Sequence, residues 1–194
     1  MARRTKAEMA QTRIALLASA RKSFALRGYA DTALDDVCTE IGLSRGALYH
    51  HFKNKKALLQ AVVEVLDLEM DQRLQHSFEI AADPWEGFQN RCKLYLSMAQ
   101  EPEIQRIILQ DARAVLGHRR AEDAQQCTSS MQQILQQLMQ EAVIYQSDAA
   151  ALAILIHGSL SEATFWIADS TDSQPRLAQS LAALQLLLNG LRVR

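Results

Sequence analysis

The sequence predicts an all-α protein of about nine helices, with a small N-terminal domain and a larger helical C-terminal domain. Apolar residues recur at helical spacing along most of the 194 residues, whereas the chain contains only seven Gly and three Pro. Lysine and arginine are concentrated near the N-terminus, and acidic residues predominate in the remainder. We place the boundary after residue 53, which gives domains of residues 1–53 and 54–194.

The first helix is predicted over residues 6–27 and should end at Gly28, because glycine commonly follows a helix C-terminus. Its apolar residues recur mainly on one side, so we expect that side to face the core. The residues concerned are Ile14, Leu17, Ala18, Phe24 and Ala25.

Two shorter helices follow, joined by a tight turn. The first of them is predicted over residues 33–41, with Thr32 as its N-cap and Gly42 just beyond its end. Ser44 caps the next, which covers residues 45–51 and carries polar and aromatic side chains. A short helix of this kind, beside a basic cluster, is one way of reading DNA in the major groove.

Six more helices are expected in the remainder of the chain from apolar periodicity and from start signals. Asp83-Pro84 and Glu101-Pro102 are pairs typical of helix starts, and Gly117 should end the sixth helix. The six are expected from about residue 54, from 84, from 102 to 116, and over residues 119–144, 148–169 and 175–192.

Charge is divided unevenly along the chain. Residues 1–60 hold eleven Lys and Arg against five Asp and Glu, a net charge of +6. Residues 61–194 hold ten against seventeen, a net charge of −7. This division is typical of a protein that binds phosphate at one end, and chance clustering of solvated charges is the alternative.

The sequence argues against several other classes of protein. Apolar runs are too short to span a membrane and the N-terminus lacks the apolar core of a signal peptide, so we expect a cytoplasmic protein. Cys38, Cys92 and Cys127 form no disulfide framework and no zinc spacing, although a redox switch through Cys92 or Cys127 stays open. There is no GxSxG, HExxH or glycine-rich loop, so we expect no enzyme, no cofactor and no metal.

A family resemblance rests on four runs of residues between Thr32 and Leu59. They are Leu34-Asp35-Asp36-Val37, Ile41-Gly42-Leu43-Ser44-Arg45-Gly46, Leu48-Tyr49-His50-His51-Phe52 and Lys55-Lys56-Ala57-Leu58. In order and spacing they resemble the DNA-binding domain of TetR-family repressors. The opening Ala2-Arg3-Arg4-Thr5-Lys6, with Thr12-Arg13, is similar to the branch that controls multidrug efflux pumps.

The resemblance implies a homodimer with two helix-turn-helix heads, which binds a palindromic double-stranded DNA operator and is released by a small-molecule effector. The residues it places at the DNA are Thr32, Ala33, Ser44, Arg45, Gly46, Ala47, Tyr49, His50, His51 and Lys55. Family members often have Ser or Thr where this chain has Ala33, so that phosphate contact is missing here or is supplied by Thr32.

Physical chemistry supports several of these roles independently. The guanidinium of Arg45 can pair with guanine O6 and N7, which gives about 1–3 kcal/mol of discrimination between bases. The basic cluster after the helix consists of Lys53, Lys55 and Lys56. It should add DNA affinity that falls as the salt concentration rises. Leu48 and Phe52 should point inward and hold the recognition helix against the core.

For the effector, the sequence offers aromatic and flexible side chains that suit an apolar cavity, although ordinary core packing is the alternative for each. The candidates are Trp85, Phe88, Tyr95, Met98, Met131, His157, Phe165 and Trp166. Few basic residues lie in this part of the chain, which favours a neutral or cationic apolar ligand. An anionic ligand would need Arg91, Lys93, Arg106, Arg113 or a helix N-terminus.

The last two helices, residues 148–169 and 175–192, are expected to form the homodimer interface, because the first is apolar nearly all round and must be covered. An internal hairpin in a monomer is the alternative. Two other functions stay open at this point. One is a thiol-based redox-responsive regulator, and the other is a helical ligand-binding or protein-binding module without DNA recognition.

Overall fold

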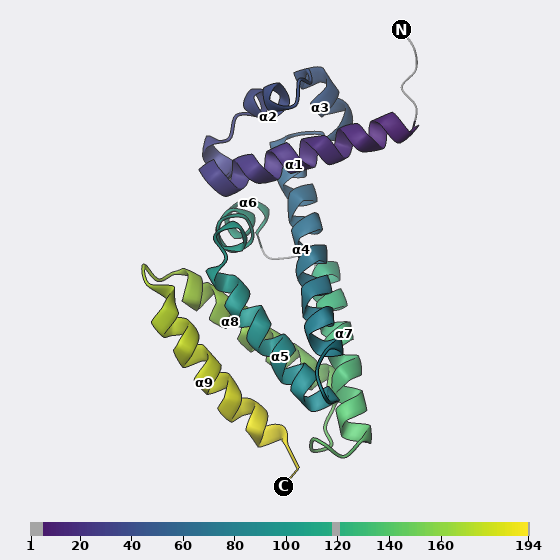
Figure 1. Ribbon diagram of the computed structural model, residues 1–194, viewed down its shortest axis with the longest axis vertical. Helices are drawn as coiled ribbons and strands as arrows, with labels where there is room; N and C mark the ends of the chain where they lie inside the picture. Colours follow the sequence, from purple (N-terminus) through teal and green to yellow (C-terminus); the bar gives the residue numbers. More distant parts are fainter. Residues whose placement is uncertain (1–5, 118–120, 194) are drawn as a thin grey trace. The chain divides into compact units, whose positions relative to one another are not determined.

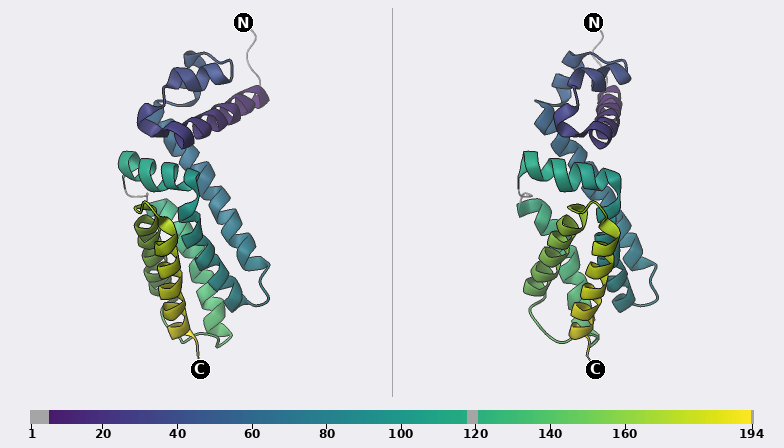
Figure 2. Two further views of the ribbon diagram at one scale, coloured as in Figure 1. Left: turned by 60° about the vertical axis from the view of Figure 1, so that its left-hand side comes forward. Right: turned by 90° about the vertical axis from the view of Figure 1, so that its left-hand side faces the viewer.

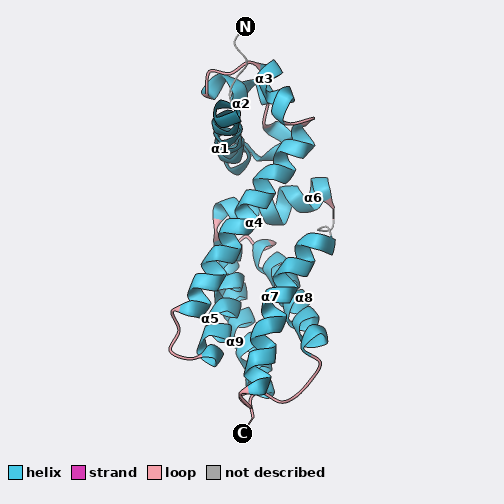
Figure 3. Ribbon diagram, turned by 90° about the vertical axis from the view of Figure 1, so that its right-hand side faces the viewer, coloured by secondary structure: helices cyan, strands magenta, loops and turns pink. Residues whose placement is uncertain are grey.

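The computed structural model describes residues 6–117 and 121–193, with the backbone alone over 121–127. Over these residues the regular structure is helical, and the extended pairing found is an isolated antiparallel bridge between Ile144 and Arg192 (Figure 3). The prediction of an all-α fold is confirmed. The basic leader at residues 2–5, His118 and the side chain of Cys127 lie outside the described part.

Contacts divide the chain into two compact units (Figure 1). The first, which we call the head, comprises Met1–Asp67 and Arg106–Gly117. The second, which we call the body, comprises Leu68–Gln105 and His118–Arg194. The boundary expected after residue 53 therefore falls inside the head, which includes the first part of α4 (Lys55–Glu79).

Three helices begin the head: α1 (Lys6–Asp31), α2 (Leu34–Glu40) and α3 (Arg45–His51). Gly28, with φ 78° and ψ 170°, interrupts the helical path of α1 where the sequence predicted its end. Gly42 follows α2 with φ 67°, which suits the residue that lacks a Cβ. The hydroxyl of Ser44 accepts the backbone N–H of Ala47 at 3.3 Å and so caps α3. These predicted starts and stops are confirmed.

The cap predicted for α2 is wrong. Ala33 is the N-cap residue, and it makes no side-chain capping bond. The hydroxyl of Thr32 is buried and donates to the carbonyl of Gly28 at 2.7 Å. A threonine between two helices can bond to the end of the first or the start of the second, and the sequence does not distinguish these choices.

The buried face of α1 is also offset from the predicted one. Leu17 and Phe24 are buried as expected, but Ile14 is exposed. Leu16 and Ala20 complete the buried face instead. Two buried serines on this face weaken its apolar period, which explains why the pattern indicated a neighbouring face.

Residues 104–116 are helical, as predicted, but most of them are not α-helical. A π-helix, η2 (Ile104–Ala112), leads into the short α6 (Arg113–Leu116). Gly117 ends the segment with φ 80°, at the predicted position. Backbone bonds in a π-helix join residues five apart, and this register matters for the contacts described below.

The body contains the second part of α4 together with α5 (Pro84–Ser97), η1 (Met98–Gln100), α7 (Ala121–Gln140), α8 (Ala149–Ala168) and α9 (Ser173–Leu191). Aspartate side chains cap three of these helices by accepting a backbone N–H. They are Asp83 for α5, Asp148 for α8 and Asp172 for α9. In the views of Figures 1 and 2, α8 lies beside α9, and it also contacts α5 and α7.

Helix α7 contributes an apolar stripe to the core of the body. Its buried members are Met131, Ile134, Leu135, Leu138 and Met139. The helix ends at Gln140, and Ala142 lies beyond this end with φ 55°. The helix predicted over residues 119–144 is therefore shorter at its C-terminus.

Helix α8 leaves large apolar side chains exposed although three helices pack against it. Ile154 and Leu155 are exposed on α8, and Leu186 and Leu187 are exposed on the adjacent α9. By length and composition alone, α8 could cross a membrane, with 28% of its most apolar window buried. The polar residues within α8 interrupt its apolar run, so run length alone does not reveal this property.

Candidate functional site

The recognition helix α3 turns most of its predicted contact residues toward solvent. Those that are exposed are Ser44, Arg45, Gly46, Tyr49 and His50, and those that are half-buried are Ala47 and His51. Leu48 and Phe52 are buried, so their predicted inward orientation is confirmed. The helix is therefore anchored by its apolar side, and its polar side is free to meet another molecule.

Arg45 is held by two neighbours. Its Nη1 lies 3.2 Å from Oδ2 of Asp35 on α2, and its Nη2 donates to the hydroxyl of Tyr49 at 3.3 Å. The guanidinium also lies 5.6 Å from the centre of the Tyr49 ring. The Tyr49 hydroxyl, followed by the Asp35 carboxylate, raises the pKa of Arg45. A guanidinium has five N–H donors, so these two bonds leave others for a DNA base.

The start of α2 offers less to DNA than the sequence implied. The Thr32 side chain is buried and committed to Gly28, so its hydroxyl does not face solvent. Ala33 is exposed but has no polar side-chain atom. Only backbone N–H groups of the first turn of α2 remain here as donors for a phosphate.

Lys55, one of the predicted phosphate contacts, is half-buried against the end of α1. Its Nζ donates to the carbonyl of Ala30 at 3.1 Å and lies 4.6 Å from the centre of the Tyr29 ring. Burial lowers the pKa of Lys55. The ammonium thus joins α4 to α1, whereas Lys53 and Lys56 are the exposed cations of this cluster.

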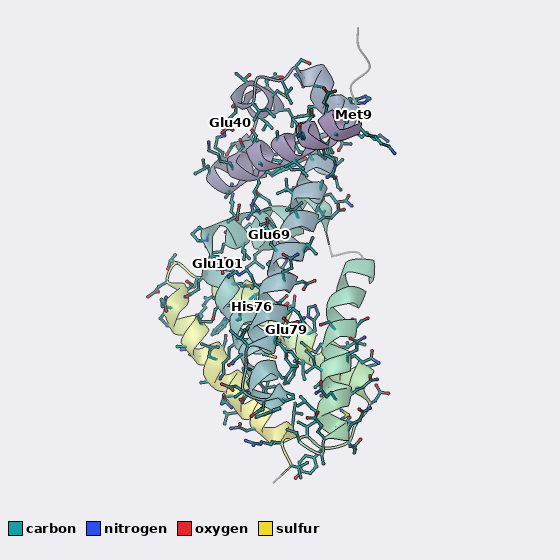
Figure 4. All side chains as sticks on the ribbon, turned by 45° about the vertical axis from the view of Figure 1, so that its right-hand side comes forward. Met9, Glu40, Glu69, His76, Glu79 and Glu101 are labelled. Carbon is teal, nitrogen blue, oxygen red and sulfur yellow. The ribbon has the colours of Figure 1, made fainter. Side chains whose placement is uncertain are left out.

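A polar bridge fixes α2 on α1. Glu40, labelled in Figure 4, accepts a hydrogen bond from Lys22. The Ser19 hydroxyl lies 3.0 Å from Oε2 of Glu40 and 3.0 Å from the carbonyl oxygen of Val37. The bond from Lys22, and then that from Ser19, lowers the pKa of Glu40. This bridge sets the position from which Asp35 reaches α3.

A second polar cluster joins residues 106–117 to the end of α1. Arg106 donates from Nη2 to the carbonyl of Arg27 at 3.2 Å. Asp111 accepts the backbone N–H of Tyr29 at 2.7 Å and lies 3.7 Å from Nε of Arg106. Residues five apart lie about 140° apart around an α-helix but share a face in a π-helix. The π register therefore lets both side chains hold the same helix end.

The body contains a small pocket that is partly open to solvent. Tyr95, Met131 and His157, all expected at a ligand site, line it, and the Tyr95 and His157 ring centres are 5.9 Å apart. The full lining is Asp71, Leu74, Arg91, Cys92, Tyr95, Met131, His157 and Leu160.

The remaining ligand candidates do not line this pocket. Trp85, Phe88 and Met98 are buried in the core, and Phe165 is half-buried on α8. Trp166 is exposed, with the Arg176 guanidinium 5.0 Å from its ring centre.

Sequence reasoning missed two charged residues of the lining. Asp71 was not among the predicted ligand residues, and Arg91 was named only as one cation that an anionic ligand would need. Arg91 is only 5% exposed. Helical spacing shows on which face of its helix a residue lies, but it does not show which helices pack together.

The described cysteines are poor candidates for a redox switch. Burial raises the pKa of the Cys92 thiol to about 12, and burial also raises that of Cys38. Both thiols are therefore protonated at neutral pH, whereas reactive cysteines are thiolates. Within the described residues, no group of three or more His, Cys, Asp or Glu side chains could hold a metal ion.

Two family models match the chain. The model "Bacterial regulatory proteins, tetR family" matches residues 16–62, and "Tetracyclin repressor-like, C-terminal domain" matches residues 85–191. The first covers the helices that carry the candidate DNA interface. The second covers most of the body and more than half of the whole chain.

Several curated relatives match a part of the chain. The transcriptional regulator TtgR of Pseudomonas putida is 44% identical over 66 residues, which is 34% of this chain and 31% of TtgR. The transcriptional repressor BepR of Brucella suis biovar 1 is 41% identical over 61 residues, which is 31% of this chain and 29% of BepR. The chain thus covers about a third of the length of these relatives.

A solved structure extends the likeness to the whole chain. It is a TetR-family transcriptional regulator from Pectobacterium atrosepticum, with 56% sequence identity and a TM-score of 0.94 over 98% of this chain and 99% of that one. The identity is high enough to relate the sequences as well as the folds. The chain belongs to the TetR family of bacterial transcriptional regulators.

Proposed function

We propose that the protein is a ligand-responsive transcriptional repressor, a cytoplasmic homodimer that binds a palindromic DNA operator and leaves it when a small molecule binds. The observation that carries this proposal is the geometry of α3. Arg45, Tyr49 and His50 are exposed on a helix whose Leu48 and Phe52 are buried beneath it. A helix held in this way can enter a major groove without unfolding the head.

The residues of α3 divide by the part of DNA that they reach. Arg45 reads a guanine through its remaining N–H donors, and His50 contacts a neighbouring base edge. Gly46 and Ala47 are small, so they let the helix approach the bases closely. Ser44 and the backbone at Ala33 meet the flanking phosphates, as do Tyr49, His51 and Lys55, with Lys53 and Lys56 adding charge.

The dimer forms through α8 and α9 in this proposal. Their exposed leucines and isoleucine lie on adjacent helices, and apolar patches of this kind mark protein interfaces. A second copy would present the same two helices and bury them in a four-helix arrangement. This interface also accounts for the apolar character that would let α8 cross a membrane.

The pocket in the body is the proposed effector site. Apolar side chains dominate the lining, and Asp71, Arg91 and His157 supply polar groups. A small, largely apolar molecule with one or two hydrogen-bonding groups suits this lining.

Release from DNA requires a route from the effector to the head. Helix α4 begins in the head and continues into the body, and η2 likewise begins in the body and enters the head at Arg106. Arg106 and Asp111 then hold the end of α1. An effector releases the DNA only if it prefers the conformation in which the two heads are wrongly spaced.

The proposal is tested by binding of the full-length protein to the DNA upstream of its own gene. Fluorescence anisotropy should show tight binding at about 50 mM salt that weakens steeply by about 200 mM. Absence of binding at every salt concentration would contradict the proposal. It would favour a helical binding module without DNA recognition.

A further inference from the structure

Two adjacent aspartates in the first turn of α2 form ion pairs with different arginines. Asp35 pairs with Arg45 of α3, with 3.2 Å between Oδ2 and Nη1. Asp36 pairs with Arg27 of α1, with 3.6 Å between Oδ2 and Nη1. Their side chains are 65% and 59% exposed, and both lie near the same helix N-terminus. The two residues therefore differ mainly in the arginine that each one holds.

The Asp35 pair fixes the direction of the base-reading side chain before DNA arrives. Asp35 and the hydroxyl of Tyr49 take one N–H bond each from Arg45. At most three of the five guanidinium donors then remain, and a bidentate contact to guanine needs two. Arg45 can thus bind guanine while it keeps both neighbours, and the binding costs less rotamer entropy because the side chain is already ordered.

The Asp35 carboxylate also weakens binding to DNA that has no guanine opposite Arg45. On such DNA the guanidinium of Arg45 can contact only phosphates. An arginine without the Asp35 ion pair would reach those phosphates more easily. The negative charge of Asp35 also repels the phosphates near α2 and α3. Asp35 therefore penalises non-specific binding more than specific binding.

We infer that Asp35 is a specificity-determining residue, which positions Arg45 for guanine and weakens binding to DNA without that guanine. It acts through Arg45 and is a positioning residue. The inference rests on the proposed DNA-binding function, and it adds to the head an acidic residue that opposes DNA binding in order to make it selective.

The test compares two duplexes and two matched variants of the full-length protein. One duplex is selected from a random-sequence library by the wild-type chain, and the other has the same base composition in scrambled order. The readout is the ratio of the Kd for the scrambled duplex to the Kd for the selected one. Asp36→Asn is the control for Asp35→Asn, because it removes one charge from the same helical turn and frees a different arginine.

For Asp35→Asn, we expect the scrambled duplex to bind about three- to fivefold more tightly and the selected duplex to change by less than about twofold, as suits one exposed ion pair. The ratio then falls by about threefold. Asp36→Asn should shift both duplexes equally and leave the ratio unchanged. Asp35→Glu, which keeps the charge, should retain most of the wild-type ratio.

A double-variant cycle separates positioning from general charge and from folding. In an Arg45→Ala background, Asp35→Asn should leave the ratio unchanged. Equal effects of Asp35→Asn and Asp36→Asn on the ratio, or a full effect of Asp35→Asn without Arg45, would overturn the inference alone. A wild-type chain that selects no sequence would instead contradict the proposed function, and the inference with it.

Discussion

In the head, the exposed side chains of α3 itself are polar or basic, whereas α8 and α9 in the body expose large apolar side chains. The buried residues of the two units are alike, since both cores are built from leucine, phenylalanine and similar groups. What differs is the surface that each unit leaves uncovered. Basic groups suit phosphate, and uncovered apolar helices suit another apolar face. The proposed function thus assigns these two surfaces to two different partners, DNA and a second copy of the chain.

The strongest test of this contrast is a charge placed on the apolar face of α8. Leu155 is 69% exposed, and Leu155→Arg should weaken the homodimer by about a hundredfold, because an unpaired charge is costly to bury. Analytical ultracentrifugation measures the change. Leu68→Arg is the matched control, since Leu68 is an exposed leucine on a different helix, α4. Equal loss in both variants would mean that α8 does not form the interface.

The contacts at the end of α1 should be sensitive to Gly28→Ala. Its φ of 78° and ψ of 170° lie in a region that is essentially restricted to glycine and costs an L-residue about 1–3 kcal/mol, and the new Cβ would lie 1.7 Å from Nη2 of Arg106. Displacing Arg106 loses its bond to α1, which adds about 1 kcal/mol. Gly42→Ala has a φ of 67° with nothing within 4 Å, so it shows the cost of a positive φ without a clash.

Urea denaturation of both glycine variants gives the two free energies of unfolding. Gly28→Ala should be the less stable by at least the value of one hydrogen bond. Equal losses of stability in the two variants would mean that the new Cβ at residue 28 does not displace Arg106.

Within the head, base reading and phosphate binding should separate. Arg45→Ala should lower the preference for the selected duplex by about 1–3 kcal/mol. Lys53→Ala should weaken binding to the selected and scrambled duplexes about equally and reduce the salt dependence. Lys53 is the better comparison, because Lys55 also ties α4 to α1. Identical profiles for the two variants in anisotropy titrations would refute the division of roles.

The smallest expected effect concerns the acid stability of the head. The pKa of Glu40 lies below its usual 4.5, mainly because Lys22 donates to it. Its contribution to folding is therefore complete above pH 4.5 and is lost as the pH falls through the lowered pKa. Glu40→Gln should make the free energy of unfolding depend less on pH below 4.5. An unchanged pH profile would show that the bridge to α1 does not stabilise the fold.

The sequence predicted what depends on neighbours along the chain. Gly28, Gly42, Ser44 and Asp83 act within a few residues of themselves, so their roles as helix stops and caps were readable. The prediction of Thr32 as an N-cap was wrong because its hydroxyl can bond either to the end of α1 or to the start of α2.

Contacts between distant residues could not be predicted in this way. The bond between Asp111 and Tyr29 joins positions far apart in the sequence, and it requires a π register that apolar spacing does not reveal. The pocket is similar, because Arg91 and Asp71 reach one space only when α4 and α5 pack. Asp35 was recognised as part of a family pattern, but its pairing with Arg45 depends on how α2 meets α3.

The most direct test of the whole account is a hydroxyl-radical footprint of the full-length protein on the duplex that it selects. A homodimer joined through α8 and α9 should protect two patches on one face of the DNA, about 34–36 Å or a multiple of that distance apart. Leu155→Arg should remove the paired pattern at the same protein concentration. A single protected patch with the wild-type protein, or a paired pattern that survives in Leu155→Arg, would contradict the account.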